Sequence, residues 1–232
     1  MRIALGKIRS IAGDIPTNIN RHLDWIERGA RNGADAIFFP ELSLSGYEPT
    51  LAATLALTSE DPVLEPLQAI ANRRNILIGV GAPLKSDLGI HIAMLIFRPQ
   101  QPVDTYAKQW LHTDEEPFFQ PGNRPHLIQW QGCNISPAIC YESLRPAHLQ
   151  QSLRFDPDVY LASVAKPQQG LDQASQYFPA VAREHQLHVL MVNSFGPADN
   201  FLAVGQSSAW DDRGQLTGSL SENTSGLLMY EW

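Results

Sequence analysis

Residues 3–41 read IALGKIRSIAGDIPTNINRHLDWIERGARNGADAIFFPE and predict a strand, a helix and a second strand in direct succession. Residues 3–8 are mostly apolar and predict the first strand. The next apolar side chains recur at the spacing of one buried helix face: Ile19, Leu23, Ile26 and Ala30. Asn32-Gly33 is typical of a helix end, and residues 36–39 form a short buried strand. This succession indicates an α/β layered fold.

Strand-like and helix-like segments keep alternating along the rest of the chain. Further helices are expected at 62–73, 146–154 and 173–186, and further strands at 76–80, 91–97, 103–107, 134–139, 159–164, 189–192, 201–210 and 227–230. The strands at 91–97 and 103–107 are joined by the turn signal Arg98-Pro99, so they should be neighbours, which argues against a purely parallel sheet. We expect one α/β domain spanning residues 1–232, built as a mixed-sheet sandwich with helices outside.

The composition of the chain excludes several classes of protein. Its 232 residues are 44% hydrophobic and 18% charged, as in ordinary globular proteins. A net charge of −7 argues against a nucleic-acid partner. No apolar run approaches the roughly 18 residues that span a bilayer, and the N-terminal apolar stretch is too short for a signal peptide. We therefore expect a cytoplasmic protein with no membrane partner. Two cysteines, Cys133 and Cys140, support neither a disulfide framework nor a zinc site.

Three reactive side chains stand directly after predicted strands, where sites gather in α/β sheets. A partly buried Glu41 would be a good proton acceptor near neutral pH. Lys108 could stabilise an oxyanion or a thiolate, and Cys140 could be a nucleophile. Each has an ordinary alternative: a surface glutamate, a lysine with a snorkelling stem, or a buried structural cysteine. No one of these residues indicates a function by itself, so the three must be considered together.

Together they resemble the nitrilase, or carbon–nitrogen hydrolase, superfamily. The likeness runs from Met1 to about Gly218 and rests on four groups of residues in order: Phe38-Phe39-Pro40-Glu41 with Gly46-Tyr47; Tyr106-Ala107-Lys108 with Leu111; Ile139-Cys140-Tyr141-Glu142 with Arg145-Pro146; and Ala182-Arg183-Glu184-His185 with Val192-Asn193-Ser194 and Gly205-Gln206-Ser207-Ser208.

The resemblance implies an amidase-type enzyme on an α-β-β-α sandwich that forms a homodimer or higher homo-oligomer. Its substrate would be a small-molecule amide, cleaved at a non-peptide C–N bond through a thioester on Cys140, with release of ammonia or an amine. Glu41 would move the protons, and Lys108 with the backbone N–H of Tyr141 would face the oxyanion. No cofactor or metal is implied.

The superfamily also supplies a second glutamate after the lysine, which would hold that lysine by a charge-assisted hydrogen bond. Counting back from Pro121-Gly122 places it at Glu115, whereas counting forward from Lys108 allows Glu116. We expect Glu115.

Three other functions stay open at the level of the sequence. An N-acyltransferase or a nitrile hydrolase of the same superfamily would use the same residues, and a catalytically inactive binding protein could keep the fold. A dinucleotide-binding protein is excluded, because no G-x-G-x-x-G follows a strand and opens a helix.

The two cysteines give a direct test. Cys140→Ala is expected to abolish turnover, whereas Cys133→Ala should stay near wild type, because only Cys140 stands at a strand end before a turn and a helix. Steady-state assays of the two variants make the comparison. Loss of activity in Cys133→Ala alone would contradict the assignment of the nucleophile.

Overall fold

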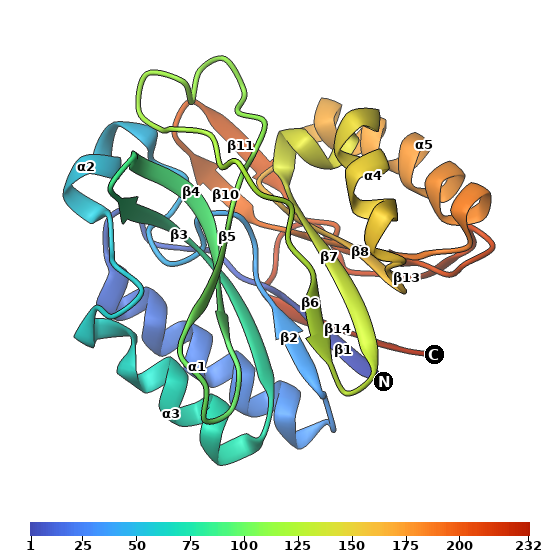
Figure 1. The fold of residues 1–232 in the computed structure, drawn as a ribbon, viewed down its shortest axis with the longest axis horizontal. Coiled ribbons are helices and arrows are strands. Elements are labelled where there is room, and N and C mark those ends of the chain that lie inside the picture. Colours follow the sequence, from blue (N-terminus) through green and yellow to red (C-terminus); the bar gives the residue numbers. More distant parts are fainter.

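The computed structural model describes residues 1–232 and has four layers. Two six-stranded sheets pack face to face, with helices on both outer sides (Figure 1). Helices α1 (Ile15–Arg31) and α3 (Glu65–Arg74) cover the first sheet. Helices α4 (Pro146–Ser152) and α5 (Gln168–His185) cover the second. The expected α-β-β-α sandwich is confirmed.

The first sheet has the strand order β14-β1-β2-β3-β4-β5. Strands β1, β2 and β3 are parallel and the other pairs are antiparallel, so the sheet is mixed, as expected. In chain order the bounds are β1 Arg2–Lys7, β2 Ala36–Phe38, β3 Leu77–Ser86, β4 Gly89–Phe97, β5 Asp104–Ala107 and β14 Gly226–Glu231.

The second sheet has the order β13-β12-β9-β8-β7-β6, with β7, β8 and β9 parallel. Its strands are β6 Ile128–Trp130, β7 Cys133–Ile139, β8 Val159–Val164, β9 His188–Asn193, β12 Ser208–Trp210 and β13 Leu216–Ser219. A separate hairpin is formed by β10 (Phe195–Ala198) and β11 (Phe201–Val204). Short helices complete the fold: η1 Pro49–Leu51, α2 Ala52–Leu55, η2 Pro62–Leu64, η3 Cys140–Leu144 and η4 Leu153–Phe155. No helix is both long and apolar enough to cross a bilayer.

Each sheet is buried on both faces, which explains the continuous apolar runs of its central strands. Successive side chains of a strand point to opposite faces. In β1, Ile3 and Leu5 enter the core between the sheets, while Ala4 enters the core under α1 and α3. In β8, Leu161 belongs to the same intersheet core and Tyr160 to the core under α4 and α5.

Three expected boundaries were wrong. The expected strand 201–210 is two strands, because Gly205 and Gln206 adopt left-handed backbone conformations with φ of 68° and 57°. Helix α5 begins five residues before the expected position 173, since the first turn tolerates Gly170. Strand β3 continues to Ser86 instead of ending at residue 80. Strands β6, β10 and β13 were not anticipated.

The glycine at position 81 in β3 allows the loop that carries Glu41 to lie directly on this strand. A Cβ atom at Gly81 would stand 2.3 Å from the backbone nitrogen of Leu42 and 2.5 Å from the carbonyl oxygen of Pro40. The carbonyl of Gly81 accepts a hydrogen bond from the amide of Leu44 at 2.9 Å. The absence of a side chain at position 81 therefore lets the backbone on either side of Glu41 lie in direct contact with β3.

Substitution of this glycine should damage both stability and activity. Because the obstructing atoms are backbone, Gly81→Ala must shift the loop, and we expect a loss of about 1–3 kcal/mol in the free energy of unfolding. Urea denaturation and an activity assay measure the two effects. Gly226→Ala is the control, since its nearest obstacle is the flexible side chain of Leu220 at 3.5 Å. Equal stability of the two variants would contradict the close-contact argument.

Candidate active site

The structure brings three strand ends together at one edge of the interface between the sheets. Glu41 follows β2 and Lys108 follows β5, both in the first sheet, whereas Cys140 follows β7 in the second. Lys108 Nζ donates to Glu41 Oε1 and to Glu115 Oε1, each at 2.7 Å. Cys140 and Glu115 line one pocket of about 520 Å³. The site is therefore assembled from both sheets.

Glu41 is a buried carboxylate with one engaged oxygen and one free oxygen. Its Oε1 accepts from Lys108, while Oε2 is buried without a hydrogen-bond partner. Burial raises the pKa of Glu41 to about 7, with Lys108 opposing the shift and Glu115 adding to it. A carboxylate that titrates near neutral pH is suited to accept and return a proton.

Lys108 is held as a cation by its two carboxylate partners. Burial alone would lower the pKa of Lys108, but the negative charges of Glu41 and Glu115 outweigh it and leave the pKa above its ordinary value. Its side chain is fully buried, so the positive charge cannot be screened by solvent. A fixed, unscreened cation of this kind can stabilise an oxyanion.

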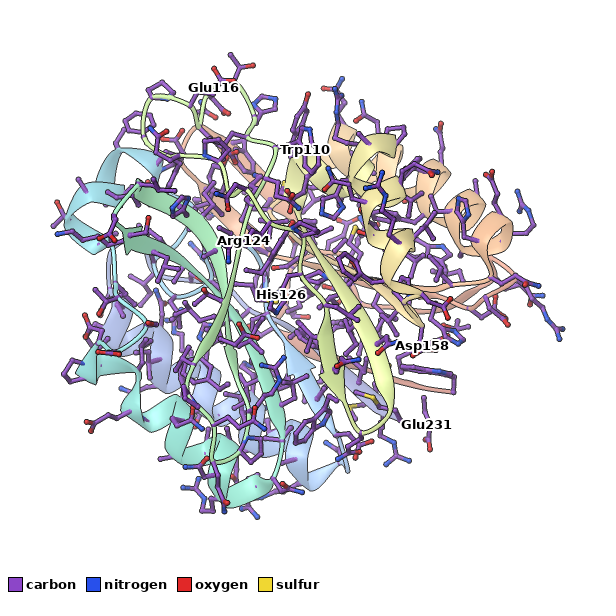
Figure 2. The ribbon with its side chains drawn as sticks, viewed as in Figure 1. Trp110, Glu116, Arg124, His126, Asp158 and Glu231 are labelled. Atoms are coloured by element: carbon purple, nitrogen blue, oxygen red, sulfur yellow. The ribbon has the colours of Figure 1, made fainter.

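Glu115, and not Glu116, is the neighbour of Lys108. Besides that contact, Glu115 accepts from the hydroxyl of Tyr47 at 2.8 Å and from the amide of His112 at 2.8 Å. Burial and the nearby carboxylates raise the pKa of Tyr47, which keeps it a neutral donor. Glu116 is exposed and lies at the outer tip of the same loop (Figure 2).

Cys140 is the first residue of η3 and makes a sharp turn directly after β7. Its φ of 47° is left-handed, and its Sγ lies 3.6 Å from the carbonyl oxygen of Ala165. Burial and the charge of Glu41 raise the pKa of Cys140 to about 12, although Lys166 and Lys108 lower it. The resting residue is therefore a neutral thiol. Tyr141, the next residue, lies in the first turn of η3, where the first N–H groups lack a partner within the helix.

Cys133 lies away from this site. It is the first residue of β7, seven residues before Cys140, and it packs in the intersheet core. Burial raises its pKa to about 12, with Asp158 contributing. It does not line the pocket that Cys140 lines.

Glu142 is a buried carboxylate that links the lysine loop to the cysteine turn. One oxygen accepts from the amides of Gln109 and Trp110, at 2.6 and 3.2 Å. The other accepts from the amide of Ile139 at 2.8 Å and from the hydroxyl of Tyr106 at 2.6 Å. It therefore fixes the residue after Lys108 relative to the residue before Cys140. The motif around Cys140 contained Glu142, but the sequence analysis assigned it no role.

Lys166 was missed by the sequence analysis. It follows β8 at the same edge of the second sheet, and burial leaves it 4% exposed. Its Nζ lies 3.4 Å from the carbonyl oxygen of Cys140, and it lines the pocket. The signal was available, since Ala165 and Lys166 stand directly after a clear apolar run.

Comparisons with known proteins agree with this arrangement. Residues 2–232 match the family model described as carbon-nitrogen hydrolase. The chain is 29% identical over 189 residues to the omega-amidase YafV of Escherichia coli strain K12, covering 81% of this chain and 72% of that protein. It is 26% identical over 220 residues to an (R)-stereoselective amidase of Pseudomonas sp, covering 93% and 79%.

A solved amidase from Nesterenkonia sp. AN1 has the same fold. One mutant of that amidase, with acrylamide added to its active-site cysteine, superposes with a TM-score of 0.90 at 25% identity, covering 100% of this chain and 93% of that one. The family match over almost the whole chain confirms the resemblance of the motifs. This chain belongs to the carbon-nitrogen hydrolase family.

Proposed function

We propose that this protein hydrolyses a non-peptide C–N bond of a small amide through a thioester on Cys140, with residues 1–232 acting as one domain. The observation that carries the proposal is the buried set of Glu41, Lys108 and Glu115, with Cys140 lining the same pocket as Glu115. The amidase names of the relatives and of the solved neighbours support the same reaction.

The first half of the reaction makes the thioester. Glu41 takes the proton of the Cys140 thiol as the sulfur attacks the amide carbonyl, since a free thiol with a pKa of about 12 needs a base. Negative charge then develops on the former carbonyl oxygen, where Lys108 and the N–H of Tyr141 stabilise it. The C–N bond breaks, and Glu41 returns the proton to the departing nitrogen.

The second half reverses these roles. Water enters, Glu41 takes one of its protons, and the resulting hydroxide attacks the thioester carbonyl. The C–S bond breaks, the sulfur regains a proton from Glu41, and the acid leaves. Glu115 acts as a positioning residue, because its contacts with Lys108, Tyr47 and the His112 amide keep the cation in place.

We also propose that the protein works in the cytoplasm as a homodimer or higher homo-oligomer. The family resemblance and the acidic composition support this proposal. Sedimentation analysis of the purified protein determines the oligomeric state.

The reaction is tested by ammonia release from a panel of small amides, with wild type beside Cys140→Ala. We expect release by wild type only, because the thiol is the nucleophile. If neither protein releases ammonia or amine from any amide, hydrolysis is contradicted. Two separate experiments then distinguish acyl transfer from a binding role: labelling of Cys140 by iodoacetamide, and an assay of the unlabelled protein with added amine acceptors.

The pKa of Glu41 predicts the pH dependence. The base must be ionised, so kcat/KM should rise with pH through a midpoint near 7 and level off above it. Glu41→Gln should lose roughly 100-fold or more and lose this limb. Glu142 also has its pKa raised by burial to about 7, so Glu142→Gln is the matched control. If the rise of kcat/KM with pH disappears in Glu142→Gln and persists in Glu41→Gln, Glu41 is not the base.

A further inference from the structure

Lys166 is a buried cation in the pocket with no carboxylate partner. Lys108, by comparison, lies between two carboxylates at 2.7 Å each. The pocket's exposed acid, Asp114, is engaged by the His112 ring at 2.5 Å. The Lys166 ammonium forms no ion pair within 4.0 Å, and its one hydrogen bond is the 3.4 Å contact with the carbonyl of Cys140. A buried ammonium with one weak neutral acceptor is costly unless an anion joins it.

The first turn of α5 lies against Lys166 and lines the same pocket. Its N-cap is Pro167, which supplies no side-chain cap, and the first bond within the helix runs from the amide of Leu171 to the carbonyl of Pro167 at 3.0 Å. The amides of the three residues before Leu171 therefore lack a partner within the helix. Gln169 and Gly170, two of the three, line the pocket.

Gly170 brings this helix end close to the lysine. A Cβ atom at Gly170 would stand 3.4 Å from both Cβ and Cγ of Lys166, so the aliphatic stem packs on the first turn. An 18-residue helix carries partial positive charge at its N-terminus, which favours anions there. The helix end and the ammonium group thus present positive charge to one wall of the pocket.

We propose that this wall, formed by Lys166 and the first turn of α5, binds a carboxylate carried by the substrate. The inference rests on the proposed amide hydrolysis and adds the substrate class: an amide with a carboxylate elsewhere in the same molecule. The cleaved bond lies at the Glu41–Lys108–Glu115 cluster, where the lysine is already paired with two carboxylates, and the substrate's carboxylate lies at the wall with unmatched positive charge. Such a substrate could carry the carboxylate on its acyl part or on its amine part.

Paired substrates of the same shape test the proposal by kinetics. Succinamate and succinamide have the same shape but carry a carboxylate and a neutral carboxamide at the acyl end, and N-acetylglycine and N-acetylglycinamide carry the same two groups on the amine side. Initial rates are compared per cleavable amide, because each neutral partner has two. In at least one pair, wild type should prefer the carboxylate by roughly 10- to 100-fold in kcat/KM, the usual range for a charged hydrogen bond. Lys166→Met should remove that preference. Lys85→Met, at an exposed lysine outside the pocket, should keep it.

The ratio within a pair is the decisive quantity. If Lys166 only stabilised the sulfur, Lys166→Met would lower both rates of a pair by the same factor, and the subsite would be refuted. Equal kcat/KM within both pairs in wild type would refute it too, whether or not the variant folds, while leaving the proposed hydrolysis intact.

A binding measurement separates the two proposals. Succinate should slow alkylation of Cys140 by iodoacetamide in wild type, propionate should do so less, and Lys166→Met should abolish the difference. If this pattern holds although no amide is hydrolysed, the carboxylate subsite stands and the proposed function falls. If succinate and propionate protect equally in wild type, the subsite falls.

Discussion

The Lys108 ammonium between the carboxylates of Glu41 and Glu115 is the interaction on which the arrangement of the site depends. All three side chains are buried, so their charges have lost water and must satisfy one another. Removing one partner of a buried ion pair typically costs about 3–5 kcal/mol, because the other charge stays uncompensated. The surroundings accordingly supply further donors: Tyr47 and the His112 amide for Glu115. Only Glu41 Oε2 is left without one, and that oxygen is the one free to exchange a proton.

A third buried carboxylate, Glu142, keeps this charged group aligned with the nucleophile, although the two belong to different sheets. Glu142 accepts hydrogen bonds from the amides of Gln109 and Ile139, so it joins the lysine loop to the cysteine turn. Tyr106 continues the network to His148, and His148 to Tyr160 in β8, at 2.9 and 2.8 Å. Burial lowers the pKa of His148 to about 4, so this network stays neutral at the histidine near pH 7. The geometry of the reaction is therefore set by hydrogen bonds that never touch substrate.

Much of this was predictable from the sequence, because strand ends are visible as apolar runs that stop. The runs before Glu41, Lys108 and Cys140 placed these residues at one edge, and the layers followed from the alternation of elements. The extension of β3 to Ser86 could not be foreseen, since Gly81 and Pro83 weaken a strand pattern. The contact of Gly81 with the backbone of the Glu41 loop is visible only in the structure. Counting residues along the chain allowed either Glu115 or Glu116 as the partner of Lys108, and the path of the loop in the structure places Glu115 there. Lys166 also follows an apolar run that stops, but the absence of an acidic partner for its charge is seen only in the structure.

The pairing of β1 with β14 has a consequence for synthesis on the ribosome. Strands β1 to β5 are complete once residue 107 has been made, but β1 stays an unpaired edge until residues 226–231 arrive. At ~5–20 residues per second this interval is on the order of ten seconds. An apolar edge strand is a template for pairing with another chain. Nascent chains that still lack β14 should therefore aggregate through β1, whereas pairing with β14 protects that edge.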